Sequence, residues 1–418
     1  MSSRTPTKVI VVGAGMVGLS TAWFLQRAGA EVTVVERGKI GSGASKGNAG
    51  WITPALTLPL TNPSMLRAGI LAAMSPKSPV YIPPAFNPRL WEFLARFAVN
   101  SRHSKWLKAA QHFVAWNKRA FEAYDAITQR DELNTQSFPM HSAPLTVAFS
   151  SPGSLSHLLE ELEVVAQLGG EVEYEILSKS ELNQAQPIVS ENAVQGLSIT
   201  NQRFIDPYRF LTALARSLQS QGGRLLEYNE ALEVLSHARM AEVRLQDQTL
   251  EAEAVVLATG SSLSRLARGF GVRRYVQSGR GYSFTVSPEQ LPDSPIYFPE
   301  QRLACTPISS GLRLAGMMEF RPDEAPLDRR RISAIVSAAG SMLRGIDWSS
   351  RSDEWVGSRP CTSDGIPLVG RSRAANIFIA GGHGMWGIAL GPLSGQLISE
   401  QIMTGETPDL LRQFDPLR

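Results

Sequence analysis

The chain has 418 residues, 43% of them hydrophobic, and a formal net charge of +3 at pH 7. This length exceeds one small domain and fits two. The nearly balanced charge, without a basic segment interleaved with aromatic residues, gives no support for nucleic-acid binding. The two cysteines, Cys305 and Cys361, form no C-x-x-C motif. A disulfide framework or a metal site is therefore not expected, and a reducing, cytoplasmic compartment is the default.

The first apolar run of the chain is Val9–Val12, which leads into a glycine-rich turn. We interpret it as a buried strand and not as a signal peptide. No apolar stretch reaches the length of about 20 residues that a membrane-spanning helix needs. We therefore expect a soluble protein, or one held peripherally on the inner face of the membrane.

A glycine motif follows this strand and carries the first functional signal. Its residues are Gly13-Ala14-Gly15-Met16-Val17-Gly18, followed by a helix pattern over 19–27 and a second strand over 31–35. Gly13 allows the tight turn, Gly15 lets the backbone approach a pyrophosphate, and Gly18 lets the helix pack closely on the strand. The helix N-terminus then faces the phosphates with free N–H groups.

The second strand ends on Glu36, which stands 18 residues after Gly18. At this spacing a carboxylate accepts hydrogen bonds from a ribose diol, and it disfavours the 2′-phosphate of NADP. Strand, glycine turn, helix, strand and acid in this order predict a dinucleotide-binding site. The pattern alone does not separate NAD from FAD.

Small and polar residues continue from Arg37 to Gly50 and end at Trp51. Such a loop offers many backbone N–H groups and little bulk. It either wraps the pyrophosphate of a cofactor or serves as a flexible surface linker. Linkers rarely stop on a buried aromatic residue, so Trp51 favours the cofactor interpretation.

A segment rich in proline, methionine and leucine, residues 54–90, includes the run Met65–Met74. Two amphipathic helices follow, near 88–99 and 104–130. Trp91, Trp106 and Trp116 stand among arginines and lysines in these helices. Two interpretations stay open, ordinary helix packing in a second domain and a patch that faces a membrane surface or a partner.

The rest of the chain alternates helices with β-meanders. Ser178-Lys179-Ser180-Glu181 has the pattern of a capping box, and Asp206-Pro207 that of a helix start. The unbroken apolar run Ala254–Ala258 indicates a buried central strand, which ends in the small-residue turn Thr259–Ser262. Further helices are predicted over 151–169, 207–221, 327–343 and 388–404, and further strands over 145–149, 196–200, 232–235, 243–245, 282–286, 296–298, 312–318 and 376–380.

A second glycine turn, Gly381–Gly387, joins the strand over 376–380 to the last helix, so a second helix N-terminus is presented there. Glycine turns of the cofactor type fall in residues 1–60, 206–268 and 352–418, and β-meander patterns fill much of the remainder. We predict a discontinuous cofactor domain from these three segments. Residues 61–205 and 269–351 are predicted to form a substrate domain.

Four stretches together resemble the D-amino-acid oxidase superfamily of FAD enzymes: Val11–Glu36, Gly41–Trp51, Ala254–Ser262 and Trp355–Gly387. They run from end to end of the chain. Within the superfamily the likeness points to small D-amino-acid dehydrogenase chains and glycine- and imino-acid-oxidising enzymes, which Gly279–Tyr282 also resembles. The resemblance implies an α/β fold, with a Rossmann-like FAD-binding domain of the glutathione-reductase type and a second, antiparallel-sheet plus helix domain for the substrate.

The resemblance also implies which residues hold FAD. The glycine motif and Glu36 hold its ADP half, Ser45, Asn48 and Ala49 line the pyrophosphate and approach the isoalloxazine, and the backbone of Val234 meets the adenine. The turn 382–387 covers the pyrimidine edge of the flavin, where a helix N-terminus stabilises negative charge. The expected set is Gly13, Ala14, Gly15, Met16, Val17, Gly18, Glu36, Arg37, Ser45, Asn48, Ala49, Gly50, Val234, Thr259, Gly260, Gly382, Gly384, Met385, Trp386 and Gly387.

Arg359, in the run Gly357-Ser358-Arg359-Pro360, matches the arginine that pairs with the substrate carboxylate in this superfamily. Its planar guanidinium holds a carboxylate with two hydrogen bonds and stays charged at any working pH. Tyr282 and His383 complete the candidate catalytic set. A tyrosine in a strand is also a common core residue, and a lone histidine is also a common structural one.

Two positions depart from the superfamily pattern. Glycine oxidases carry an active-site tyrosine three residues before the proline that matches Pro307, and this chain has Ala304 there. This difference argues against an oxidase-type substrate clamp. Some members attach flavin through a cysteine near the Arg359 stretch, but Cys361 stands four positions from that place, so FAD is expected to be non-covalent.

The implied reaction is oxidation of the amine carbon of a D-amino acid or an N-substituted amino acid. Hydride passes to flavin N5, and the resulting imine is hydrolysed to an oxo acid. The electrons go to a quinone or a carrier protein in a dehydrogenase, and to dioxygen, with formation of hydrogen peroxide, in an oxidase. A third interpretation is a flavoprotein subunit of a larger complex with little activity alone.

Overall fold

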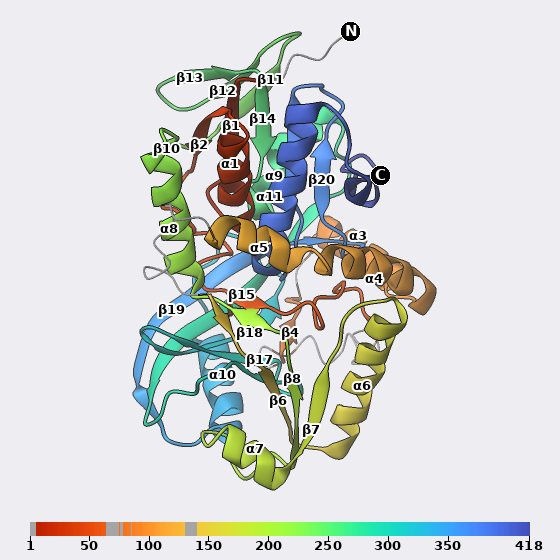
Figure 1. Ribbon diagram of the computed structural model, residues 1–418, viewed down its shortest axis with the longest axis vertical. Coiled ribbons are helices and arrows are strands. Elements are labelled where there is room, and N and C mark those ends of the chain that lie inside the picture. Colours follow the sequence, from red (N-terminus) through yellow and green to blue (C-terminus); the bar gives the residue numbers. More distant parts are fainter. Residues whose placement is uncertain (1–5, 64–74, 76–77, 85, 130–139) are drawn as a thin grey trace.

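A computed structural model describes residues 6–63, 75, 78–84, 86–129 and 140–418 of the chain. Two large β-sheets organise these residues, one toward each end of the molecule (Figure 1). The C-terminal end of the chain lies beside the upper sheet in that view. Helices α3 (Pro88–Asn100), α4 (His103–Asn117) and α5 (Ala120–Thr128) cross the middle of the molecule.

The upper sheet has six strands and carries the glycine motif. Its order is β10-β2-β1-β14-β21-β20, and neighbouring strands are parallel except for β20, which runs antiparallel to β21. The parallel pairing brings the carboxyl ends of β1, β2, β14 and β21 to one edge, where ligands bind in such sheets. The strands are β1 (Lys8–Val12), β2 (Glu31–Val35), β10 (Arg224–Leu226), β14 (Ala254–Leu257), β20 (Leu368–Arg371) and β21 (Ile377–Gly381).

Both faces of this sheet are buried, which explains why its strands are almost continuously apolar. Val9 and Val11 belong to a core shared with helices α1 (Met16–Arg27), α8 (Pro207–Ser220) and α11 (Gly387–Thr404). Ile10 and Val12 belong to a core on the opposite face. That face is covered by the antiparallel meander of β11 (Glu233–Ser236), β12 (Ala241–Arg244) and β13 (Thr249–Ala252), and by the short helix α9 (Leu263–Ala267).

Helices α1 and α11 approach each other closely through a glycine. A Cβ at Gly395 of α11 would come within 2.6 Å of the backbone nitrogen of Thr21 in α1. A larger residue at this position would therefore push the two helices apart. Their close packing holds the starts of both helices, each preceded by a glycine turn, in one layer of the protein.

The lower sheet is mainly antiparallel and has the order β19-β15-β18-β17-β16-β6-β8-β7, with β4 beside β18. Helices α7 (Lys179–Ala185) and α10 (Arg329–Met342) pack into one of its cores, and α6 (Pro152–Gln167) packs into another. A small third sheet joins β3 (Trp51–Ile52), β9 (Arg203–Phe204) and β5 (His141–Ser142). The strands of the lower sheet are β4 (Val80–Tyr81), β6 (Leu145–Phe149), β7 (Tyr174–Ser178), β8 (Gln195–Ile199), β15 (Val276–Pro288), β16 (Ile296–Phe298), β17 (Leu303–Ile308), β18 (Gly311–Glu319) and β19 (Ile346–Thr362).

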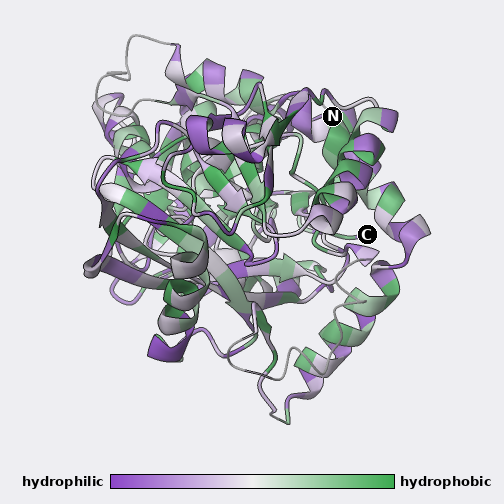
Figure 2. Cartoon of the chain, turned by 90° about the horizontal axis from the view of Figure 1, so that it is seen from below, coloured by the Kyte–Doolittle hydropathy of each residue, from purple (hydrophilic) through white to green (hydrophobic). Residues whose placement is uncertain are grey.

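The peripheral helices are amphipathic, and Figure 2 shows hydrophobic and hydrophilic residues alternating along them. In α6, Leu155, Leu158, Leu162 and Val165 recur at helical spacing and are the buried residues of the helix. Such a spacing buries one stripe of a helix and leaves the opposite side to solvent. The helix predicted over 151–169 is confirmed on this basis.

The predicted α/β fold class is confirmed, and two helix starts are confirmed at the level of single hydrogen bonds. Asp206 caps α8 by accepting from the backbone N–H groups of Tyr208 and Arg209. Ser178 and Glu181 form the reciprocal capping box at the start of α7. In both cases the cap is formed by residues that are close in sequence, so it can be predicted without knowledge of tertiary contacts.

The segment 104–130 differs from its prediction. It forms two helices, α4 and α5, because the backbone leaves the helical conformation at Arg119 (φ −110°, ψ 1°). Trp106 and Trp116 are buried in protein cores, whereas Trp91 of α3 is 45% exposed. Ordinary packing therefore accounts for two of the three tryptophans.

The strands of the upper sheet come from residues 8–35, 224–257 and 368–381, which fall inside the three segments predicted to form the cofactor domain. Strand β19, however, starts at Ile346 and stays in the lower sheet as far as Thr362. Residues 352–362 of the third segment therefore belong to the lower sheet. The division into two domains at the stated boundaries stays a prediction.

The run Met65–Met74 lies outside the described residues. Among the residues that the structure does describe, no helix combines the length and the apolar character needed to cross a membrane.

Candidate active site

Loops at the carboxyl ends of β1, β2, β14 and β21 line a cavity of about 320 Å³, here called the first cavity. Thirteen of the residues predicted to bind the cofactor are in its wall, contributed by the two glycine turns, the loop after Glu36 and the turn after β14. They are Gly13, Gly15, Met16, Val17, Glu36, Arg37, Ser45, Asn48, Thr259, Gly260, Gly384, Met385 and Gly387.

The other predicted cofactor residues lie behind or beside this wall. Val234 of β11 buries its side chain in the core under the meander, whereas Ala231 lines the first cavity three residues earlier. Ala49 and Trp386 line a neighbouring cavity. Besides Val234, four predicted cofactor residues line neither cavity among the described residues: Ala14, Gly18, Gly50 and Gly382.

The glycines of the first motif have different physical reasons to be glycine. Gly13 adopts φ +110°, and a Cβ there would overlap the carbonyl of Ala258, while a Cβ at Gly18 would overlap the carbonyl of Gly13. These two positions are fixed by protein packing. A Cβ at Gly15 would meet the hydroxyl of Ser45 at 3.4 Å, which is ordinary contact. Packing does not demand glycine at position 15, so the free space there serves the cavity.

The carboxylate of Glu36 ties the end of β2 to the first glycine turn. It accepts a hydrogen bond from Ala14 N at 2.8 Å and another from Gly38 N at 2.9 Å. Charge-assisted bonds of this kind are stronger than neutral ones. Glu36 therefore fixes the shape of the cavity at this end as well as presenting negative charge to it.

Sequence reasoning missed several polar residues of the first cavity. Asp323, from the segment after β18, accepts a hydrogen bond from the hydroxyl of Ser261 at 2.8 Å, and Glu230 pairs with Arg265 at 2.7 Å. Both acids come from irregular segments far from the glycine motifs in sequence. No local pattern marks such residues, because tertiary contacts alone bring them to the cavity.

A second cavity of about 270 Å³ adjoins the first, since Ala44, Asn48, Arg359 and Met385 line both. It lies against the lower sheet. Most of its wall is apolar, with Asn62, Glu161 and Arg302 as further polar members. The apolar wall residues include Trp51, Leu56, Leu58, Leu60, Pro79, Val80, Leu158, Ala304, Ala315, Met317, Met318, Trp355 and Trp386.

Trp355 joins the loop after Glu36 to the lower sheet. A Cβ at Gly47 or at Gly357 would overlap the indole ring of Trp355. Glycine at both positions therefore lets the ring lie in close contact with the backbone of the loop and of β19. This contact fixes one wall of the second cavity beside the junction with the first.

Arg359 is a half-buried residue of β19 at the junction of the two cavities. Its Nη1 donates a hydrogen bond to the carbonyl of Met317 at 2.7 Å, and a Cβ at Gly281 would overlap its guanidinium. Burial lowers the pKa of Arg359 from its ordinary value, yet an arginine stays charged at working pH. The structure thus places a fixed positive charge where the two cavities meet.

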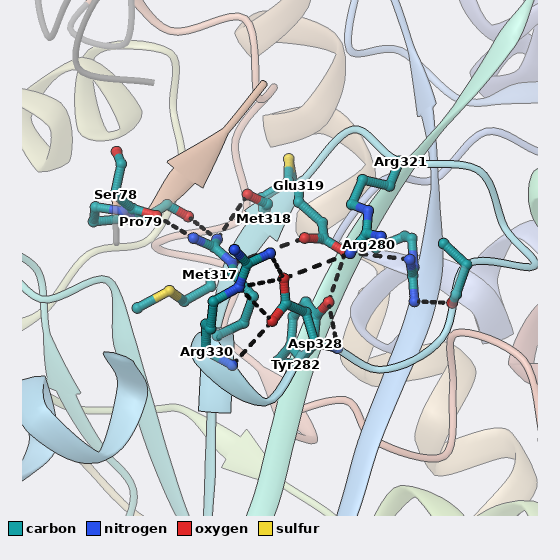
Figure 3. A network of polar contacts seen from close by, with 12 residues as sticks. Ser78, Pro79, Arg280, Tyr282, Met317, Met318, Glu319, Arg321, Asp328 and Arg330 are labelled. Atoms are coloured by element: carbon teal, nitrogen blue, oxygen red, sulfur yellow. Dashed lines mark hydrogen bonds and ion pairs between the residues drawn. The ribbon is translucent and has the colours of Figure 1, made fainter. Parts of the chain in front are cut away.

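Tyr282 lies inside the lower sheet and not at either cavity. It is completely buried, and its hydroxyl donates to Glu319 Oε1 at 2.6 Å within a network of charged residues (Figure 3). Burial, with further contributions from Glu319, raises the pKa of Tyr282 above its ordinary value. Of the two interpretations of its sequence, the buried core tyrosine is the one that fits this position.

His383 lines the first cavity at the start of the second glycine turn. One ring nitrogen, Nε2, shares a hydrogen bond with the hydroxyl of Ser394 at 2.7 Å, and Nδ1 has no hydrogen-bond partner among the described residues. Burial lowers the pKa of His383 from 6.5 to about 3. The imidazole is therefore neutral at physiological pH and does not add a second positive charge beside Arg359.

The depressed pKa of His383 predicts how stability depends on pH. The unfolded chain takes up a proton at this histidine below about pH 6.5, whereas the folded protein does so only near pH 3, so stability is complete above pH 6.5 and falls on acidification. Between pH 7 and pH 5 we expect the free energy of unfolding to fall by about 2 kcal/mol more in the wild type than in His383→Gln. Chemical denaturation at both pH values measures the difference. An NMR signal of His383 that titrates near pH 6.5 in the folded protein would contradict the assignment.

Comparison with known proteins places this arrangement in a family. Curated relatives include the D-amino acid dehydrogenase of Xanthobacter autotrophicus, 26% identical with 96% of each chain covered, and that of Vibrio vulnificus, 27% identical with 96% of each chain covered. Among solved structures, glycine oxidase from Geobacillus kaustophilus is similar with a TM-score of 0.76. It is 20% identical and covers 100% of this chain and 99% of its own.

The first cavity fits FAD on its own geometry. Space is left open at Gly15, the carboxylate of Glu36 stands at one end, and the N-termini of α1 and α11 both reach the wall. Helix N-termini present N–H groups and a positive dipole end to phosphates and to negatively charged rings. The model of the FAD dependent oxidoreductase family matches residues 8–401, and the chain belongs to this family.

Proposed function

We propose that this protein is an FAD-dependent amino-acid dehydrogenase that oxidises the amine-bearing carbon of a D-amino acid or an N-substituted amino acid. The observation that carries the proposal is the position of Arg359, which lines both cavities. A guanidinium at this junction holds a substrate carboxylate beside the cofactor. The rest of the substrate then extends into the second, mainly apolar cavity.

The relatives support the substrate class. Those from Xanthobacter autotrophicus and Vibrio vulnificus are named D-amino acid dehydrogenases, and the similar structure from Geobacillus kaustophilus is a glycine oxidase. We carry the class of amino-acid substrates over to this chain. A cavity of about 270 Å³ beside Arg359 gives room for a substrate side chain larger than that of glycine.

For the cofactor, we assign the ADP half to the end of the first cavity that contains Glu36, and the flavin to the end that contains Arg359 and Met385. The adenine contact expected at Val234 is assigned instead to Ala231, which lines the cavity. Non-covalent binding is supported by the cysteines, since neither cavity has a cysteine among its described wall residues. Cys361 is buried, and burial raises the pKa of its thiol to about 12, so a reactive thiolate is absent at neutral pH.

The residues of this chain orient the substrate and exclude water. Arg359 has five N–H donors, so its bond to Met317 leaves further donors for a carboxylate. Trp355 and the apolar wall remove water from around the substrate, which strengthens this charge pair. Bound FAD supplies the acceptor for the hydride that leaves the substrate carbon. A substrate amine that binds in its neutral form needs no general base, and we assign none.

We favour a quinone or a carrier protein over dioxygen as the electron acceptor. Ala304 lines the second cavity where the resemblance to glycine oxidases leads to a tyrosine, so that clamp is missing here. Of the tryptophan-bearing helices, we assign a peripheral membrane contact to α3, because its tryptophan is the exposed one. Phe86 just before this helix is 97% exposed and Trp91 is 45% exposed, with Arg89 and Arg96 nearby in sequence.

Replacement of Glu36 tests the cofactor assignment. Glu36→Arg should purify with little or no FAD, because it places a cation at the ribose end and removes the acceptor of the Ala14 and Gly38 N–H groups. Glu36→Gln keeps the shape and one amide oxygen, and it should retain part of the flavin. Flavin content after gel filtration measures both variants. Full flavin in Glu36→Arg would refute the ribose assignment, and flavin that stays with the acid-precipitated protein would refute non-covalent binding.

Replacement of Arg359 tests the substrate class. Arg359→Ala should keep FAD but lose amino-acid substrates. Arg359→Lys keeps the charge without the two-pronged geometry, and it should lose about 2–4 kcal/mol of transition-state stabilisation. The measurement is kcat/KM for amino acids, N-substituted glycines and carboxyl-free amines. Arg203→Lys, at an arginine that pairs with Asp125 and lines neither cavity, is the matched control. The proposal is wrong if carboxyl-free amines are the best wild-type substrates.

Two assays on the purified protein identify the electron acceptor. An amino-acid substrate should bleach the flavin in the absence of air, and this outcome excludes a subunit that is inactive alone. Turnover with a quinone dye should then exceed turnover with air by at least tenfold. Equal rates, with one hydrogen peroxide formed per substrate, would show that the protein is an oxidase.

A further inference from the structure

We propose that a buried ionic cluster, Arg280, Glu319 and Arg331 with Tyr282, positions Arg359 by holding a β-bulge in β18. This inference rests on the role proposed for Arg359. It assigns a function to charged residues that lie behind the second cavity and touch neither substrate nor cofactor. Figure 3 draws this network, in which the tips of the Glu319 and Tyr282 side chains meet and Ser78 and Pro79 lie at the edge.

The bulge is visible in the pairing of β15 with β18. Arg280 pairs with Glu319 and Tyr282 pairs with Gly316, so two residues of β18, Met317 and Met318, stand opposite Gly281 alone. Met317 has φ +59°, a left-handed conformation that is unusual for a residue with a side chain. Bulges bend a strand locally and redirect its groups, and they are frequent beside active sites.

The redirected group here is the Met317 carbonyl, which accepts the hydrogen bond from Arg359 Nη1 at 2.7 Å. The residue opposite the bulge is Gly281, and its missing side chain makes room for the same guanidinium. Met317 and Met318 also line the second cavity. One local irregularity of β18 therefore sets both the direction of Arg359 and part of the wall that a substrate meets.

The cluster contacts the bulge at the residues on its C-terminal side. Glu319 follows Met318 directly, and its carboxylate accepts from the Tyr282 hydroxyl at 2.6 Å and lies 3.3 Å from Arg280 Nη1. Arg331 Nη2 donates to the Met318 carbonyl at 3.0 Å, and its Nε lies 3.9 Å from Glu319. Both strands that form the bulge are thus bound to the same group of buried charges.

Arg331 also binds the segment that leads into β4. Its Nη1 donates to the carbonyl of Ser78 at 2.6 Å and its Nη2 to that of Pro79 at 3.3 Å. Pro79 and Val80 are part of the wall of the second cavity. The same guanidinium therefore holds the bulge and the neighbouring wall segment in a fixed relation.

Burial and strain together favour a positioning role. Arg280, Glu319 and Arg331 are at most 1% exposed, and desolvating such charges is costly unless they are paired and hydrogen-bonded. A left-handed residue such as Met317 persists only where its surroundings over-determine its conformation. A cluster that fixes the residues beside Met317 supplies that constraint. Loss of one cluster member should then let the bulge relax and turn the Met317 carbonyl away from Arg359.

The test compares a carboxylate probe with its uncharged analogue. Benzoate and benzamide are titrated into the FAD-loaded protein, and binding is followed by the change in flavin absorbance. The variants are Glu319→Gln, which keeps the size of the side chain, and Tyr282→Phe, which removes a single hydroxyl. Asp125→Asn is the matched control, because it removes the charge that pairs with Arg203, and neither residue lines a cavity or belongs to the bulge.

We expect both cluster variants to bind benzoate at least tenfold more weakly than the wild type, with benzamide affinity unchanged, while Asp125→Asn binds both like the wild type. The loss of kcat/KM should follow the loss of benzoate affinity. If Glu319→Gln does not fold, the comparison of benzoate with benzamide is made with Tyr282→Phe alone. Wild-type benzoate affinity in a folded cluster variant, or an equal loss for both probes, would overturn the positioning role. If Arg359→Lys also binds benzoate like the wild type, the proposed function fails as well, and the two failures are thereby distinguished.

Discussion

The hydrogen bond from Arg359 to the Met317 carbonyl is the contact on which the arrangement of the site depends. It joins β19 to β18 across β15, at the place where the first cavity opens into the second. The upper sheet builds much of the first cavity from strand ends and glycine turns, and strands of the lower sheet form one wall of the second. Arg359 belongs to the lower sheet and lines both cavities, and in the proposed function its orientation relates a bound substrate to the cofactor.

Among the described residues, few charged groups lie at this junction, and those behind the second cavity are paired with one another or with backbone carbonyls. His383 is held neutral by burial, so at the junction of the two cavities it adds no positive charge to that of Arg359. Behind the cavity, Arg280 and Arg331 share one carboxylate, Glu319, and backbone carbonyls accept further hydrogen bonds from both guanidinium groups. Carbonyl dipoles thus compensate buried cations without adding anions that would compete with a substrate carboxylate for Arg359.

The sequence was most informative where the physical cause is local. The glycine turn before α1 and the caps of α7 and α8 are each specified by a few consecutive residues, and the structure has each of them where it was predicted. The binding of a ribose by Glu36 stays a prediction. The interpretation of Arg359 needed the resemblance to a family, because its partner Met317 lies 42 residues away. The β-bulge could not be predicted from the sequence. The strand pattern over 312–318 predicts a strand but does not show where its pairing register shifts.

The same reasoning explains why Tyr282 was ambiguous and Asp323 was missed. A tyrosine in an apolar strand suits a core or a cavity equally well, and the deciding contact is with Glu319, 37 residues away. Asp323 lies in an irregular segment, where no periodicity indicates which way a side chain points. Val234 lies in strand β11, as predicted, and its contact with the adenine stays a prediction, although Ala231 is the residue of this segment that lines the first cavity.

The central claim is that Arg359 binds a carboxylate at the junction of the two cavities. A crystal structure of the FAD-loaded protein with bound benzoate tests it most directly. We predict the benzoate carboxylate within hydrogen-bonding distance of the Arg359 guanidinium, with Arg359 Nη1 still bonded to the Met317 carbonyl and the benzoate ring in the second cavity. Benzoate bound elsewhere, or a guanidinium turned away from Met317 toward a different partner, would contradict the account.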